Sequence, residues 1–240
     1  MESIKLIGTS HIAKQSIEEV TKAIESFKPL IIAVELDSKR FLALQEENKE
    51  KKQGKKSSLS IKSIFKIGFK GYLFALIGSY SSKKLGSFVN ATPGDEMLTA
   101  IKLAKENNLE VALIDQDIEI TLQRFSKTLS WKERWVFVKD IFKSIFRRKK
   151  IIQEYKELGL DIETLDLSKV PSKETVIQLT SFMKRKYPNI YKVLIAERNT
   201  YMVKSLIKMR RKYPEKKILV IVGAGHLEGM EKELLKYDAV

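Results

Sequence analysis

The chain contains two histidines, and each lies three residues after a glycine at the end of an apolar run. His11 closes GTSH (8–11), and His226 closes GAGH (223–226) near the other end of the chain. An imidazole can bind a metal ion or exchange a proton near neutral pH. The repeated Gly-x-x-His frame therefore predicts that both histidines belong to one site.

Two carboxylates lie at the carboxyl ends of two other apolar runs. Glu35 lies near the end of LIIAVEL (30–36), and Asp115 ends EVALID (110–115). Two imidazoles and one carboxylate are a ligand set for Zn²⁺, Mn²⁺ or Co²⁺ that leaves positions open for water. The simpler interpretation is that the histidines form ordinary hydrogen bonds and the carboxylates pair with arginines. The arginines considered for such pairs are Arg40, Arg124 and Arg198.

The elements that would position these residues are four short apolar runs typical of strands buried on both faces of a parallel sheet. They are residues 4–8, 30–36, 110–115 and 218–223. In an open α/β sheet, ligands bind beyond the carboxyl ends of the strands, which is where these polar residues fall. We therefore predict an α/β fold with a mostly parallel central sheet, formed by strands from both termini, and a large helical insertion.

We predict a single domain, 1–240. Its α/β core comprises about 1–48, 92–116 and 190–240, and its insertions comprise about 49–91 and 117–189.

Helical periodicity fills the segments between the predicted strands. Ser16 and Glu19 have the spacing of a capping box at the start of the first helix, which Pro29 follows. The segment 191–214 carries an apolar stripe and ends at Pro214. The first helix lies between two apolar runs. This pattern predicts a β-α-β unit with a right-handed crossover, whose two strands form a parallel pair.

Composition excludes several classes of function. The chain has no cysteine, so disulfides, thiol catalysis and zinc–thiolate sites are excluded. Its net charge of +15 is concentrated in lysine-rich segments such as 48–58 and 143–150, which lack a nucleic-acid recognition motif. A solvated basic surface is the preferred interpretation, and nucleic-acid binding is not expected. No secretory signal is recognised, so a cytoplasmic location is the expectation.

The segment 60–80 combines apolar residues with lysines four positions apart, which is the pattern of a basic amphipathic helix. Its apolar run is too short to span a bilayer. We favour a helix that covers the core or a homodimer interface. Docking of this segment on a membrane surface, through Lys62, Lys66 and Lys70, is the alternative.

Other site types fit the sequence less well. GAGHLEG resembles a glycine-rich dinucleotide turn, but too few residues follow Gly229 for the next strand and its acidic residue. IGTSH lacks the lysine of a phosphate-binding loop. Ser10 stands beside His11 but has no nucleophile elbow, so covalent catalysis is the weakest enzymatic option.

Several motifs, in order along nearly the whole chain, resemble the TraB/PrgY family, which is related to the Tiki proteases. They are IGTSH with VELDSKR, TPGDEM (92–97), LIDQDIEITLQR (113–124), AERNTYM (196–202) and VGAGHLEGM (222–230). The chain departs from the family pattern at Ser10, where alanine is common, and at Asn199, where aspartate is common. Neither residue is expected to touch the proposed ligands, but Asn199 removes a charge from the expected pocket wall. The membrane-spanning C-terminal region of many relatives is not recognised here.

The resemblance implies a fold similar to erythromycin-esterase-like and ChaN-like proteins. It also implies a metal-dependent peptidase that prefers Mn²⁺ or Co²⁺, or a role in shutting down peptide pheromone signalling. The implied metal ligands are His11, His226 and Glu35. The implied catalytic residues are His11, Glu35, His226, Glu197 and Arg198. The expected pocket residues are Gly8, Thr9, Ser10, Arg40, Asp115, Arg124, Gly223 and Gly225.

Three functions follow from these expectations. The first is metal-assisted hydrolysis of a peptide, with Glu35 or Glu197 as the base and Arg198 stabilising the oxyanion. The second is a non-catalytic module that binds or sequesters a peptide at the same strand ends. The third is a membrane-associated regulatory scaffold that acts through residues 60–80.

Overall fold

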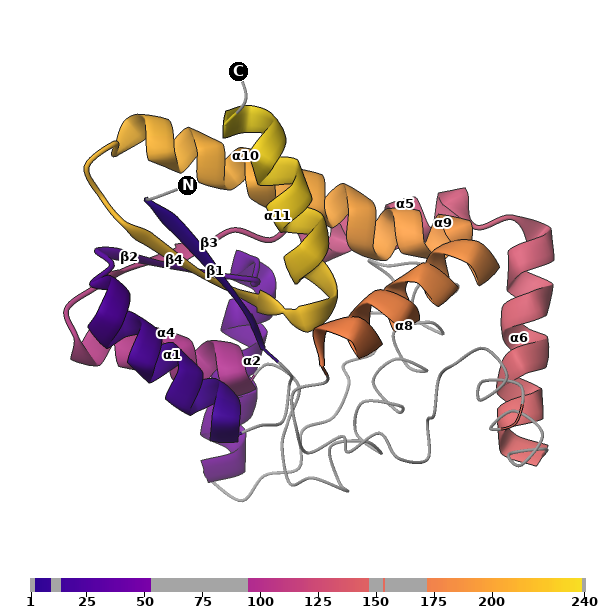
Figure 1. Cartoon of the computed structure of the whole chain (residues 1–240). Helices are drawn as coiled ribbons and strands as arrows, with labels where there is room; N and C mark the ends of the chain where they lie inside the picture. Colours follow the sequence, from indigo (N-terminus) through magenta and orange to yellow (C-terminus); the bar gives the residue numbers. More distant parts are fainter. Residues whose placement is uncertain (1–2, 10–13, 53–94, 147–152, 154–171, 239–240) are drawn as a thin grey trace.

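The computed structural model describes residues 3–9, 14–52, 95–146, 153 and 172–238 (Figure 1). Ser10, His11, the segment 60–80, and the parts of the lysine-rich segments at 53–58 and 147–150 lie outside the described residues. The predictions that concern them, including the His11 half of the shared site, therefore stay predictions.

A four-stranded parallel sheet forms the centre of the described chain. Its strands are β1 (Ile4–Thr9), β2 (Ile31–Val34), β3 (Glu110–Leu113) and β4 (Ile218–Gly223), in the spatial order β1-β4-β2-β3. All three strand pairs are parallel. The prediction of an α/β fold with strands from both termini is confirmed, because β1 pairs with β4 along its whole length.

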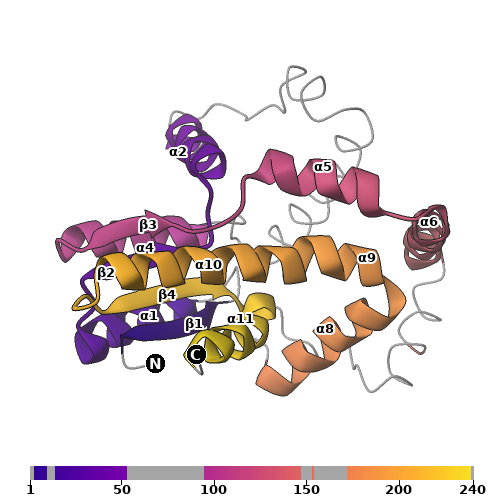
Figure 2. The ribbon, with the colours of Figure 1, turned by 90° about the horizontal axis from the view of Figure 1, so that it is seen from above.

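Helices surround the sheet and extend beyond it (Figures 1 and 2). Those of the first half are α1 (Lys14–Phe27), α2 (Ser38–Lys52), α4 (Asp95–Glu106), α5 (Ile118–Thr128) and α6 (Trp131–Phe146). Those of the second half are α8 (Lys173–Lys186), α9 (Pro188–Tyr191), the π-helix η1 (Lys192–Ala196), α10 (Glu197–Lys212) and α11 (Ala224–Asp238).

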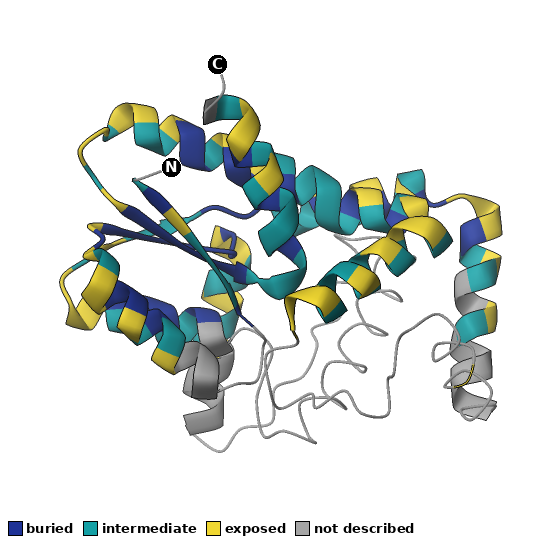
Figure 3. Cartoon of the chain, viewed as in Figure 1, coloured by how far each residue is buried: buried dark blue, intermediate teal, exposed yellow. Residues whose placement is uncertain are grey.

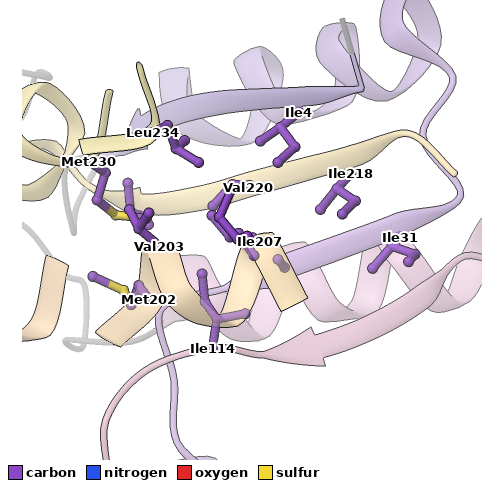
Figure 4. Packing of buried hydrophobic residues seen from close by; sticks show 13 residues of the cluster. Ile4, Ile31, Ile114, Met202, Val203, Ile207, Ile218, Val220, Met230 and Leu234 are labelled. Carbon is purple, nitrogen blue, oxygen red and sulfur yellow. The ribbon is translucent and has the colours of Figure 1, made fainter. Parts of the chain in front are cut away.

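Alternation along the strands divides the core into two layers. In β4, Ile218, Val220 and Val222 face α10 and α11, whose buried side chains include Met202 and Met230 (Figure 4). The intervening strand residues pack against α1 and α4 on the other face; in β4 they are Leu219 and Ile221. Successive strand side chains point to opposite faces, so nearly continuous apolar runs are required to fill both layers.

Three details differ from the sequence predictions. The first two strands do not form the expected parallel pair, because β4 lies between β1 and β2 and pairs with both. Helix α1 begins at Lys14, so Ser16 lies inside its first turn and not at the N-cap position that a capping box requires. The predicted helix 191–214 is divided by η1, a π-helical turn that directly precedes Glu197. Such turns widen the backbone spiral locally and often occur at functional sites.

None of the helices among the described residues is both long and apolar enough to cross a membrane.

Candidate active site

The carboxyl ends of the parallel strands bring three of the predicted residues to one edge of the sheet. Glu35 and Asp115 follow β2 and β3, and His226 lies in the first turn of α11, just after β4. Alternation along β2 places Glu35 on the same face as Ile31 and Ala33, toward α10 and α11. Glu35, Asp115 and His226 are all buried.

Arg198, in the first turn of α10, joins these three residues. Its Nε donates to Asp115 Oδ1 at 3.0 Å, and its Nη2 donates to Asp115 Oδ2 at 2.6 Å and to Glu35 Oε1. Its Nη1 donates to the carbonyl oxygen of Leu194 at 3.1 Å and lies 3.1 Å from His226 Nε2. A guanidinium has five N–H groups, and all of them are directed at these partners. Burial lowers the pKa of Arg198, but the two carboxylates outweigh it and raise that pKa above its ordinary value.

Glu35 is held ionised in its buried position. Its Oε2 accepts a 2.7 Å hydrogen bond from the backbone N–H of Gly223, and its Oε1 lies 3.3 Å from His226 Nε2. Burial alone would raise the pKa of Glu35. The imidazole of His226, the guanidinium of Arg198 and the Gly223 N–H together hold that pKa well below its ordinary value.

Asn199 fixes the orientation of the His226 ring. His226 Nδ1 lies 2.6 Å from Asn199 Oδ1, and an amide oxygen can only accept, so Nδ1 carries a proton. His226 Nε2 then accepts from Arg198 in the neutral imidazole, or donates to Glu35 Oε1 in the protonated one. Both protonation states of His226 therefore have a partner at Nε2.

Gly229 provides the space that Asn199 needs. A Cβ atom at Gly229 would lie 2.2 Å from Asn199 Nδ2, closer than real Cβ contacts allow. Asn199 itself is only 2% exposed, so its amide has little room to move away. Gly229, one turn after His226 in α11, is therefore required for the pairing of Asn199 with His226.

Asp37 and Arg40 brace the cluster from α2. Asp37 Oδ1 accepts from the backbone N–H groups of Lys39 and Arg40, at 2.9 and 3.0 Å, and so caps the start of this helix. Arg40 Nη1 then donates to Asp115 Oδ2 at 2.9 Å. Asp115 thus receives hydrogen bonds from two guanidinium groups, which compensate the charge of the buried carboxylates.

Arg124 and Glu197 form a separate ion pair that does not join the cluster. Arg124 Nε and Nη2 donate to the two Glu197 oxygens at 2.6 and 2.7 Å. This bidentate pair links α5 to α10 and leaves the Arg124 side chain half exposed. The hydrogen bonds from Arg124 lower the pKa of Glu197, so this carboxylate is engaged as a fixed anion and not placed as a base beside His226.

Two of the remaining predicted pocket residues, Gly8 and Thr9, have packing roles in the described structure. A Cβ atom at Gly8 would lie 3.0 Å from Leu227, so this glycine lets α11 approach β1. The hydroxyl of Thr9 donates to the carbonyl oxygen of Val222 at 3.2 Å and thereby joins the ends of β1 and β4. The nearest atom to a Cβ at Gly225 would be Thr180 Cγ2 at 4.0 Å, so this position is open.

Asn199 and Gly229 are the site residues that sequence reasoning missed. Asn199 was expected in the pocket wall without contact to the proposed ligands, which is wrong, because its Oδ1 lies 2.6 Å from His226 Nδ1. Gly229 was considered only as the last glycine of a rejected dinucleotide turn. Their spacing held a usable signal: Asn199 directly follows Arg198, and Gly229 follows His226 by three residues, which is close to one helical turn.

The described donors do not fit a divalent metal in their present arrangement. Both oxygens of Glu35 and of Asp115 accept hydrogen bonds, and His226 Nε2 faces the Arg198 guanidinium. A cation at Nε2 would lie against this buried positive charge. Accordingly, no group of three metal-binding side chains occurs among the described residues. The metal site predicted with His11 stays a prediction, since His11 lies outside them.

Comparison with known proteins identifies relatives along nearly the whole chain. The model of the TraB/PrgY/gumN family matches residues 2–237. An uncharacterized protein of Methanocaldococcus jannaschii is 37% identical over 237 residues, which are 98% of this chain and 54% of that protein. The TraB domain-containing proteins of Mus musculus and Homo sapiens are 24% and 23% identical, over 95% of this chain and 62% of theirs. The chain thus spans little more than half the length of these relatives.

A solved structure, of an erythromycin esterase mutant in its open conformation, aligns with a TM-score of 0.34 at 12% identity. The alignment covers 92% of this chain and 60% of that one, and the likeness is too loose to assign a site.

Proposed function

The chain belongs to the TraB/PrgY/gumN family, and from that premise we propose that the cluster around Arg198 is the active site of a hydrolase that cleaves peptide or similar amide bonds. The observation that carries this proposal is the setting of His226. Its Nδ1 is fixed by Asn199, and its Nε2 lies between a partner for the neutral ring, Arg198, and a partner for the protonated ring, Glu35.

His226 is the proton carrier in this proposal. During attack on an amide carbonyl, Nε2 accepts the proton of the attacking water and later delivers it to the leaving amine. Ionised Glu35 stabilises the imidazolium between these steps, because its Oε1 lies 3.3 Å from Nε2. Asn199 keeps the second ring proton on Nδ1 throughout.

Arg198 is a positioning residue in this scheme. We predicted that it stabilises the oxyanion, but its N–H groups are already directed at Glu35, Asp115, Leu194 and His226. We assign it instead the role of holding Glu35 and Asp115 in a buried site. The resemblance to Tiki proteases supports a peptide as substrate, and His11 is the second group that the family motif would add.

Incubation of the protein with a quenched-fluorescence peptide library, with and without chelator, tests the proposal. We expect cleavage to fall by about 10²–10⁴-fold in His226→Gln, the usual contribution of a general acid–base residue. Glu197→Gln is the matched control, because it changes a carboxylate of the neighbouring helical turn that pairs with Arg124 instead. Cleavage that persists in His226→Gln and is lost in Glu197→Gln would contradict the assignment.

Addition of a chelator distinguishes metal-dependent hydrolysis from hydrolysis that uses His226 without a resident metal. Cleavage that chelator abolishes and Mn²⁺ or Co²⁺ restores, in the wild type but not in His11→Ala, would support the metal site expected from the family resemblance. Cleavage unaffected by chelator would support proton transfer by His226 without a resident metal.

A non-catalytic peptide-binding module is the second candidate. It is favoured by the fact that the side chains of the cluster around Arg198 are already bonded to one another. Since His226 is only 5% exposed and its partners are engaged, the same residues could maintain the shape of a binding surface. Calorimetric titration with peptides that are bound but not cleaved would support this candidate.

A further inference from the structure

Helix α6 presents two large aromatic side chains to solvent. Trp131 is 72% exposed and Trp135 is 71% exposed, and their spacing of four residues places them on one face. They are the two tryptophans of the whole chain. The helix lies at the end of the molecule that is remote from the sheet (Figure 2). Figure 3 shows exposed residues on this helix. Burial in a core therefore does not explain either tryptophan.

The acidic side chains of α6 that the structure describes point toward the neighbouring helices and not toward solvent. Glu133 is buried and accepts hydrogen bonds from the backbone N–H and the side chain of Asn189. Asp140 accepts a hydrogen bond from the hydroxyl of Tyr187 and forms a 2.8 Å ion pair with Lys186. The negative charges of this segment are thus used to attach α6 to the region around α8 and α9.

The basic residues have the opposite placement. Lys132 and Lys139 are exposed, and Arg134 lies over the ring of Trp131 at 5.2 Å from its centroid. The outer side of α6 therefore combines two tryptophans with positive charge, while its carboxylates face inward. Among the described side chains of α6, the two tryptophans thus lie on the solvent side, where an amphipathic surface helix ordinarily carries only polar residues.

We propose that this outer side of α6 docks on the surface of an anionic lipid bilayer. Tryptophan is enriched at the membrane–water interface, where its ring is buried at the level of the headgroups and its N–H remains hydrated. Lys132 and Lys139 would contact the phosphates and carboxylates of the lipid headgroups.

Charge distinguishes a bilayer from a second copy of the chain as the occupant of this surface. Two copies packed face to face would bring like-charged lysines together, on a chain whose net charge is already +15. An anionic bilayer supplies the complementary charge. The surface differs from the segment 60–80 predicted from the sequence, and the proposal does not depend on hydrolase activity.

Intrinsic fluorescence tests the proposal directly, because α6 carries both tryptophans. The probes are vesicles of phosphatidylcholine alone and vesicles containing about one third phosphatidylserine. We expect a blue shift with the anionic vesicles, and we expect each of Lys132→Ala and Lys139→Ala to weaken partition on the order of fivefold. The absence of a shift, an equal shift with neutral vesicles, or a concentration-dependent shift without lipid would overturn the proposal.

Vesicle co-sedimentation of Trp131→Ala/Trp135→Ala supplies the second test. The substitutions are on the exposed side, so far-UV circular dichroism should match that of the wild type, while binding falls at least tenfold. Tyr201→Ala, which removes an exposed aromatic ring from α10, is the matched control and should bind normally. Full binding by the double tryptophan variant, with loss in Lys62→Ala/Lys66→Ala/Lys70→Ala, would assign membrane contact to the segment 60–80 and overturn the role of α6.

Discussion

Two groups of ion pairs lie near the carboxyl ends of the strands, and they differ mainly in burial. In the inner group, Arg198 bonds Glu35 and Asp115, all with side chains less than 15% exposed. In the outer group, Arg124 forms a geometrically excellent bidentate pair with Glu197, but the Arg124 side chain is 52% exposed. Both groups connect elements that are distant in sequence.

Geometry alone does not determine how much an ion pair contributes to the stability of the fold. Water screens the outer pair and can replace either partner when the other is removed. The inner group has little access to solvent, so removal of one partner leaves an uncompensated buried charge.

Removal of the central guanidinium should have the largest effect on stability. Arg198→Met leaves the buried carboxylates of Glu35 and Asp115 without their shared counterion, which should lower the free energy of unfolding by about 3–5 kcal/mol. Urea denaturation followed by circular dichroism measures this change. A loss no greater than that caused by Arg124→Met would remove the distinction between the two groups.

Neutralisation of Glu35 should have the next largest effect and should depend on pH. Glu35→Gln weakens hydrogen bonds to charged groups, so we expect a loss of about 2–3 kcal/mol at neutral pH. The pKa of Glu35 in the folded chain is well below 4.5, so its stabilising contribution is complete above pH 4.5 and is lost as pH falls through the folded-state pKa.

The difference in stability between wild type and Glu35→Gln should therefore narrow on acidification. Urea denaturation of both proteins between neutral and acidic pH checks this result. A constant difference across the range would show that the charge of Glu35 is not the stabilising feature.

The stability of the inner group should also depend on the position of the Asn199 side chain, which the space at Gly229 allows. Gly229→Ala places a Cβ atom 2.2 Å from Asn199 Nδ2, so we expect a loss of about 1–2 kcal/mol and displacement of the His226 ring. Gly225→Ala is the matched control in the same helix, because its Cβ would meet only Thr180 at 4.0 Å. Thermal unfolding and the ring-proton NMR signals of His226 report the two effects. Equal behaviour of the two variants would exclude a special role for Gly229.

Disruption of the outer pair should have the smallest effect. Arg124→Met should change the urea midpoint only slightly, and the change should vanish in about 0.5 M NaCl because salt screens exposed charges. The Arg198→Met effect should persist at the same ionic strength. A salt-resistant loss in Arg124→Met would show that this pair is less hydrated than its exposure indicates.

The sequence was sufficient to predict the sheet and half of the site. Four apolar runs indicated the strands, and their parallel order brings Glu35, Asp115 and His226 to one edge. The alternative that carboxylates pair with arginines was also correct for Glu35 and Asp115, whose partners are Arg198 and Arg40. These features depend on strand direction and on charge, and both can be predicted from short stretches of the sequence.

Features that depend on tertiary fit could not be predicted in this way. Glu197 and Arg198 are neighbours, yet Arg198 enters the buried cluster and Glu197 pairs with Arg124 outside it. Neighbouring residues of a helix point about 100° apart. The rotation of α10 that buries Met202 and Leu206 in the core therefore also decides which of the two neighbours enters the cluster. The clearance between Gly229 and Asn199 likewise exists only after α10 and α11 have packed together.

The order of strands in the sheet also has a consequence for synthesis on the ribosome. β4 lies between β1 and β2, and the hydroxyl of Thr9 reaches a carbonyl 213 residues further along the chain. Among the described strands, β1 has none to pair with, and β2 lacks its inner neighbour, until residue 223 has left the exit tunnel. During most of elongation the nascent chain therefore exposes two strand edges with unpaired N–H and C=O groups, the kind of edge that promotes aggregation.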